Sequence, residues 1–102
     1  MTIGEQLAKT SDSILDLILA TKDIERKKEL REYLTAVLAL TGKLVEAKVD
    51  RDTEKYKAAS KALTSANAAI KEAIDDIKNV AETIKKLAKA VDLVGKLVDS
   101  LA

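Results

Sequence analysis

Residues 53–101 read TEKYKAASKALTSANAAIKEAIDDIKNVAETIKKLAKAVDLVGKLVDSL, and this stretch decides the fold. An apolar residue recurs every seven positions in two rows, which are offset from each other by three residues. The first row is Tyr56, Leu63, Ile70, Ile77, Ile84, Val91 and Val98, and the second is Ala59, Ala66, Ala73, Val80, Leu87, Val94 and Leu101. Because rows with this spacing lie on one side of an α-helix, the stretch predicts one amphipathic helix of the coiled-coil type over 53–101.

An alternative stays open within this stretch. Ser65 and Asn67 are residue types that cap helices, and they interrupt a run of stronger helix formers. A break near Asn67 would divide 53–101 into two helices and produce a four-helix bundle. No proline occurs in the chain, so no residue enforces either choice.

The first half of the chain predicts two further helices, over 3–21 and 24–49. Thr2 and Glu5 have the spacing of a capping box, which starts a helix at Ile3. The apolar faces around Ile14 and Leu30 are 16 residues apart, which leaves them roughly 160° apart on one straight helix. A turn at 21–23 lets both faces point inward, with Asp23 as the cap of the second helix.

Three further features of the sequence concern the ends and the continuity of these two helices. The interval 8–13 is rich in Ser and Thr, so the first turns of the first helix are expected to fray. The second helix is expected to end near Val49, where Asp50 and its neighbours break the pattern. Gly42 costs about 1 kcal/mol of helix propensity relative to Ala, and we interpret it as a close contact with a neighbouring helix.

Composition agrees with an all-α protein. Hydrophobic residues make up 47% of the 102 residues and charged residues 34%, which is a globular balance. The aromatic residues are Tyr33 and Tyr56, so the core consists of thin aliphatic layers. No Asn-Gly or Asp-Gly hairpin turn and no alternating apolar run is present. We therefore predict a single domain over 1–102, an antiparallel helical bundle of three helices.

Helix lengths lead to the candidate interaction site. A helix over 53–101 would be roughly 73 Å long, and a second helix of about 25 residues covers it only to Ile77. The stripe beyond that point then lacks a partner in the same chain. Residues predicted to bind a partner are Ile77, Ile84, Leu87, Val91, Val94, Val98 and Leu101. A second copy of the chain or a partner protein would cover them.

Catalytic and metal chemistry find little support. The chain has no histidine and no cysteine, so the usual general base, thiolate and soft metal ligands are absent. Glu72, Asp75, Asp76 and Asn79 are the best oxygen-ligand group, but Asp75 and Asp76 point about 100° apart on a helix. We interpret this group as a solvated face. The sequence predicts no enzyme activity, no cofactor and no metal site.

Charge argues against nucleic acid and leaves a membrane surface as an alternative. The net charge is +1, and the basic run Arg26-Lys27-Lys28 with Arg31 is interleaved with carboxylates. Residues 84–98 carry an apolar face bordered by lysines, a pattern of helices that lie on membranes, although no Trp or Phe anchors it. The longest apolar run, 36–40, is too short to span a bilayer, so a soluble, cytoplasmic protein is expected.

The sequence thus predicts a non-enzymatic protein–protein interaction or self-assembly module that acts through the aliphatic stripe of its C-terminal helix. A homo-oligomer or a complex with a partner protein follows, without nucleic acid. Two alternatives are a membrane-surface or lipid-binding amphipathic protein and a small helical partner-binding protein of the immunity, chaperone or adaptor type. The last rests on fold-level analogy, because helical bundles host many functions.

Overall fold

The computed structural model describes residues 2–44 and 53–101, and these residues form four α-helices. In chain order the elements are α1 (Ile3–Ala20), α2 (Ile24–Leu44), α3 (Glu54–Asp75), a short 3-10 turn η1 (Ile77–Asn79) and α4 (Val80–Asp99). The predicted all-α class and antiparallel bundle are confirmed. The predicted single helix over 53–101 is wrong, because this stretch folds into two helices.

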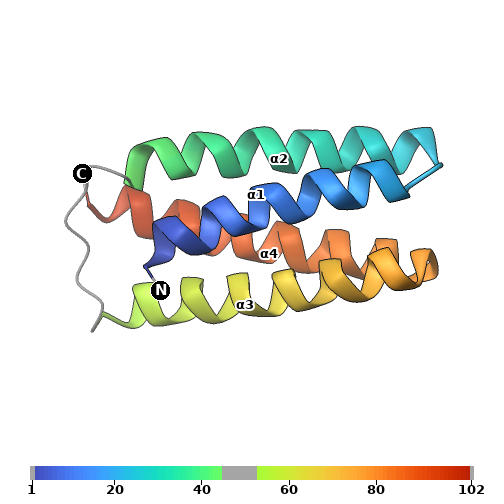
Figure 1. Ribbon diagram of the computed structural model, residues 1–102. Helices are drawn as coiled ribbons and strands as arrows, with labels where there is room; N and C mark the ends of the chain where they lie inside the picture. Colours follow the sequence, from blue (N-terminus) through green and yellow to red (C-terminus); the bar gives the residue numbers. More distant parts are fainter. Residues whose placement is uncertain (1, 45–52, 102) are drawn as a thin grey trace.

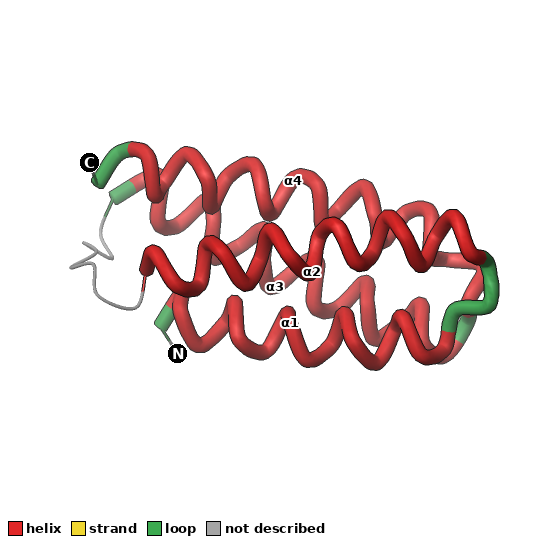
Figure 2. The backbone as a smooth tube through the Cα atoms, turned by 90° about the horizontal axis from the view of Figure 1, so that it is seen from above, coloured by secondary structure: helices red, strands yellow, loops and turns green. Residues whose placement is uncertain are grey.

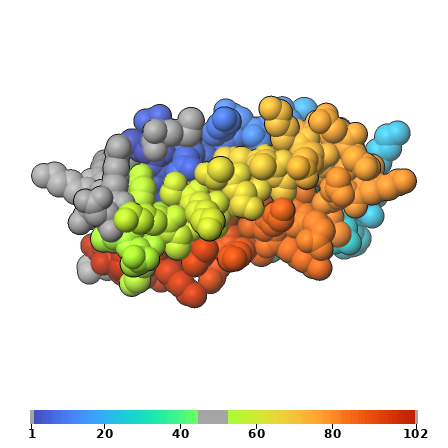
Figure 3. Space-filling model, turned by 90° about the horizontal axis from the view of Figure 1, so that it is seen from below, coloured from blue at the N-terminus to red at the C-terminus, as the bar shows by residue number. Residues whose placement is uncertain are grey.

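The four helices form two antiparallel hairpins that lie side by side (Figures 1 and 2). Helix α1 packs against α2 and α3, and α4 packs against the same two helices. Seen from the α3 side, α3 runs between α1 and α4 (Figure 3). The bundle is elongated, with principal extents of 39 × 19 × 18 Å.

The break between α3 and α4 lies at Asp76, nine residues beyond the alternative position at Asn67. Asp76 leaves helical geometry, with φ −138° and ψ 100°, and its side chain accepts a hydrogen bond from the Lys78 N–H at 3.2 Å. Asp75 and Asp76 also place two carboxylates at the C-terminal end of α3, where the helix dipole disfavours negative charge. Asn67, in contrast, lies inside the continuous helix α3.

Matched helix lengths give a second reason for this position. A break at Asp76 yields helices of 22 and 20 residues, close to the 18 residues of α1 and the 21 described for α2. Each helix can then bury its apolar face along its whole length. A break at Asn67 would leave one short helix and one that projects beyond the bundle, with its apolar face in water.

The predicted heptad rows are confirmed in α3 and shifted in α4. In α3 all six row positions are buried: Tyr56, Ala59, Leu63, Ala66, Ile70 and Ala73. In α4 the most deeply buried rows are Val80, Leu87 and Val94 with Thr83, Ala90 and Leu97. The row through Ile84, Val91 and Val98 lies at the edge of the core. The interruption at Asp76 thus re-aims α4 so that its apolar face meets both α3 and α2.

The first hairpin follows the sequence prediction closely. Thr2 caps α1 by accepting from the Glu5 N–H at 3.1 Å. Helix α1 ends at Ala20, and the Asp23 carboxylate accepts from the N–H groups of Glu25 and Arg26 at the start of α2. The fraying expected over 8–13 is wrong, because this interval is helical and Thr10 and Ser11 are buried within it.

Helix α2 is the least buried of the four. Leu30, Val37 and Leu44 are buried, and they form a single row with seven-residue spacing. Tyr33, Leu34 and Leu40 of the predicted face pack against the core only partly. The close contact predicted for Gly42 is wrong, since a Cβ placed there meets no atom within 4 Å. The predicted helix end near Val49 lies outside the described residues.

Replacing Leu87 tests whether α4 is part of this core. Leu87 is fully buried, so Leu87→Ala is expected to lower the free energy of unfolding by about 2–5 kcal/mol. Leu101→Ala removes the same side chain from an exposed position at the C-terminal end of the bundle and is expected to change it much less. Urea unfolding followed by circular dichroism measures both. Equal effects of the two substitutions would contradict the assignment of α4 to the core.

Gly95 lies inside α4, in open space, and does not have a positive φ. Gly95→Ala is therefore expected to raise the free energy of unfolding by about 0.5–1 kcal/mol, through lower backbone entropy of the unfolded chain. Lys89→Gly, at an exposed position of the same helix, is expected to lower it by about 1 kcal/mol. Thermal unfolding of both variants measures the two signs. A destabilising Gly95→Ala would show that this position needs glycine.

Candidate functional site

The structure divides the seven residues predicted to bind a partner. Ile84, Leu87 and Val94 are buried in the core of their own chain, and Val91 and Val98 are partly buried against it. Ile77 and Leu101 are exposed, at opposite ends of the bundle. The premise that the stripe lacks a partner within the chain is wrong, because α4 packs along α3 and α2. A folded bundle therefore does not offer the three buried side chains to a second protein.

The contact between α1 and α3 includes several hydrogen bonds made by side chains. Ser60 donates to the Gln6 Oε1 at 2.8 Å, and the Gln6 Nε2 donates to the Thr64 Oγ1 at 3.2 Å. At the end of this contact the Ile3 N–H donates to the Tyr56 hydroxyl at 3.0 Å. Hydrogen bonds of this kind hold α1 to α3 in a fixed register, since each bond needs its partner at one position.

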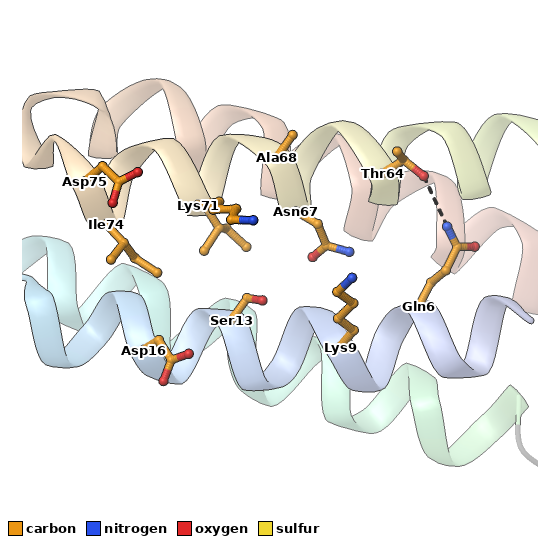
Figure 4. A pocket seen from close by; sticks show the side chains of 11 residues that line it. Gln6, Lys9, Ser13, Asp16, Thr64, Asn67, Ala68, Lys71, Ile74 and Asp75 are labelled. Carbon is orange, nitrogen blue, oxygen red and sulfur yellow. Dashed lines mark hydrogen bonds between the residues drawn. The ribbon is translucent and has the colours of Figure 1, made fainter. Parts of the chain in front are cut away.

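A groove of about 640 Å³ follows this polar contact (Figure 4). Side chains of Lys9 and Ser13 from α1 and of Asn67 from α3 point toward one another across it. Asp16, Lys71 and Asp75 lie toward the far end. The groove therefore has a mixed polar lining with charges of both signs.

The polar groups that line this groove are hydroxyl, amide, amine and carboxylate side chains. Ser13 has neither a histidine nor a cysteine beside it, because the chain contains none. The buried Oδ1 of Asn67 has no hydrogen-bond partner among the described residues. Within 2–44 and 53–101 no group of three or more acidic, histidine or cysteine side chains is placed to hold a metal ion. Asp76, from the predicted oxygen-ligand group, caps η1 through its carboxylate.

Exposed apolar side chains gather on a different part of the molecule. Of the seven large apolar side chains that are exposed in the described part of the chain, four belong to the α1–α2 hairpin. Their exposed fractions are 48% for Leu15, 83% for Leu19, 81% for Ile24 and 55% for Leu38. Scattered exposed leucines are ordinary, so what matters is whether these four lie on one side of the hairpin.

These side chains belong to two strips with the same spacing of 3, 4, 3 and 4 residues. The α1 strip consists of Glu5, Ala8, Asp12, Leu15 and Leu19. The α2 strip consists of Ile24, Lys27, Arg31, Leu34 and Leu38. Positions with this spacing lie along one side of a helix. We refer to the two strips together as the α1–α2 face.

Packing places both strips on the same outer side of the bundle. The buried residues of α1 form an arc around the helix. Gln6, at one edge of this arc, is hydrogen-bonded to α3, and α1 packs against α3 and α2. Ser11 and Ile18, at the other edge, therefore lie beside α2. Leu15 follows Ser11 by one turn, so the α1 strip borders α2.

On α2, Arg26 lines a groove with Val80 and Ala81 of α4 and so marks the α4 side. Leu34 lies one turn after the buried Leu30, on the flank of the buried row that is opposite to Arg26. The α2 strip, which contains Leu34, therefore borders α1. The two strips are therefore neighbours on a surface that faces away from α3 and α4.

Charge is segregated between the two strips. The α1 strip carries the carboxylates of Glu5 and Asp12, and the α2 strip carries the cations of Lys27 and Arg31. Among the described residues Asp12, Lys27 and Arg31 form no ion pair within 4 Å. Arg26, from the same basic run, instead pairs with Glu29 at 3.3 Å. Both strips of the face thus carry apolar side chains, and the charged side chains are acidic in the α1 strip and basic in the α2 strip.

Sequence reasoning missed Leu15 and Leu19. The signal was present, because five of the six residues 14–19 are aliphatic, and a helix on the outside of a bundle buries only part of its circumference. At least two of these side chains had to point to solvent. The helical spacing of Leu7, Ile14, Leu17 and Ile18 leaves Leu15 and Leu19 outside the buried face, but exposed leucines alone do not indicate a binding surface.

Comparison with protein-family models, curated proteins and solved structures finds no match to this chain. No helix within the described residues is both long enough and apolar enough to cross a bilayer.

Alanine substitutions at two polar residues between α1 and α3 are expected to have different effects on the free energy of unfolding. Gln6→Ala removes its hydrogen bonds with Ser60 and Thr64, while the Thr64 hydroxyl still donates to the Ser60 carbonyl, and is expected to lower the free energy of unfolding by about 1 kcal/mol. Asn67→Ala removes a buried, unpaired acceptor from a helix and is expected to leave it unchanged or raise it by up to about 1 kcal/mol. Chemical denaturation measures both. A loss above about 1 kcal/mol in Asn67→Ala would show that its amide is paired in solution.

Proposed function

We propose that the protein is a non-enzymatic protein-interaction module that binds through its α1–α2 face. The observation that carries this proposal is the exposure of Leu15, Leu19, Ile24 and Leu38 on one hairpin. Burying such side chains against a partner contributes roughly 25 cal/mol for each Å² of apolar surface removed from water. The opposite sides of α1 and α2 are buried against the α3–α4 hairpin.

This proposal moves the interaction site from α4 to the first hairpin. The sequence argument sought a stripe that the chain cannot cover itself, and that reasoning remains sound. It applies to α2, where Leu30, Val37 and Leu44 form the buried row and the flanking side chains stay accessible.

The lipid-binding alternative rested on the apolar face of 84–98, and burial of Ile84, Leu87 and Val94 leaves no specific observation in its favour. The cytoplasmic location stays a prediction.

Site-specific photo-crosslinking tests the proposal in cells that express the protein. A photoreactive amino acid at position 19 or 38 is expected to give covalent adducts with protein, because both positions lie on the α1–α2 face. Matched probes at Lys61 and Lys89, which are exposed along the α3–α4 groove, are expected to give few adducts. Mass spectrometry identifies the captured chains, a second copy of this protein included.

Two results would contradict the proposal. Absence of protein adducts at positions 19 and 38 would show that the face stays solvated in the cell. Equal yields at all four positions would show random collision rather than a defined interface.

A further inference from the structure

The α1–α2 face is complementary to itself in one orientation. Asp12 lies nine residues before the turn residue Thr21, and Arg31 lies eight residues after Asp23, so the two side chains sit at about the same level along the hairpin. They belong to different strips and carry opposite charges. Leu19 and Ile24 likewise share a level at the turn end of the hairpin.

Two copies of this face can meet about a two-fold axis in either of two directions. An axis across the helices would place α1 on α1 and α2 on α2. Asp12 would then face Asp12 and Arg31 would face Arg31, which is a repulsive arrangement. An axis parallel to the helices places α1 of each copy on α2 of the other. Asp12 then faces Arg31 at the same level, and Leu19 faces Ile24.

We propose that the partner of the α1–α2 face is a second copy of this chain, docked about a two-fold axis parallel to the helices. This inference rests on the proposed function and names the occupant of the same surface. Each such dimer contains two Asp12–Arg31 pairs and two Leu19–Ile24 contacts. The helices that meet run in opposite directions, since α1 and α2 are antiparallel within each hairpin.

A stable dimer through this face would have to cover most of one long side of the bundle. One long side of the bundle measures 39 by 19 Å, which is on the order of 700 Å². Standard stable complexes bury roughly 800 Å² on each partner. The apolar side chains give the affinity, whereas exposed ion pairs contribute little energy and mainly select the orientation.

A charge-reversal exchange tests the dimer and its orientation together. Asp12→Lys makes both strips basic at this level, and Arg31→Glu makes both acidic. Each variant alone is expected to dimerise at least about tenfold more weakly than the wild type. An equimolar mixture is expected to recover dimers near the wild-type affinity, because every interface pair is again of opposite sign. Analytical ultracentrifugation over about 1 µM to 1 mM covers the relevant range of affinity.

Matched controls keep the same changes in net charge away from the face. Glu32→Lys and Lys61→Glu alter exposed residues outside both strips and are expected to dimerise like the wild type. Circular dichroism confirms that each variant retains its helices. Leu19→Ser is expected to weaken the dimer without unfolding the monomer, because this side chain is mostly exposed.

Cysteine pairs test the register, and the chain contains no native cysteine. A mixture of Leu19→Cys and Ile24→Cys chains is expected to form disulfide-linked heterodimers on mild oxidation. A mixture of Leu19→Cys and Leu38→Cys chains is expected to form few, since these positions lie at opposite ends of the face.

Several outcomes would overturn the proposal. A wild type that sediments at the monomer mass of 11.0 kDa throughout would exclude a second copy as the occupant. A mixture of the two charge variants that stays monomeric would exclude this orientation. If crosslinks at positions 19 and 38 then captured a different protein, the second copy would be wrong while the proposed function would stand. Absence of any protein crosslink would contradict both.

Discussion

Keeping the aliphatic stripe of residues 53–101 out of water is the constraint on which the rest of the structure depends. The turn at Asp76 folds this stretch back on itself, and α4 then buries Leu87 and Val94 against helices of its own chain. Two hairpins of nearly equal length follow, and they pack along their full length. The hydrophobic effect thus selects the position of the turn, and the Asp76 carboxylate makes that position locally stable through its hydrogen bond to the Lys78 N–H.

The two hairpins play different parts. The α3–α4 hairpin is packed with alanine, leucine, isoleucine and valine along its inner side, which lets its two helices approach closely. The α1–α2 hairpin also contributes aliphatic side chains to the core, adds polar contacts through Gln6 to α3, and keeps several aliphatic side chains in solvent. The exposed aliphatic side chains of the α1–α2 hairpin are the basis of the proposed interaction surface. Segregated charges on that surface restrict how a partner can approach.

Local patterns in the sequence predicted most of the fold. The phase difference between Ile14 and Leu30 located the first turn, and the capping residues Thr2 and Asp23 located two helix starts. The turn at Asp76 was not predicted because the heptads continue through it in the sequence. The features that favour a hairpin with this turn are the adjacent carboxylates of Asp75 and Asp76 and the lengths of the other helices. The α1–α2 face was not predicted because the apolar spacing of α1 only leaves Leu15 and Leu19 outside its buried side, and their alignment with the α2 strip depends on how the two helices pack.

One distance tests the central claim that residues 53–101 form a hairpin. Lys61 and Lys89 are 28 residues apart and line the same groove between α3 and α4. With spin labels at Lys61→Cys and Lys89→Cys, diluted with unlabelled protein, double electron–electron resonance is expected to give a distance below about 25 Å, since packed helix axes are roughly 8–10 Å apart. A single continuous helix would separate these positions by about 42 Å. A distribution centred there would contradict the hairpin.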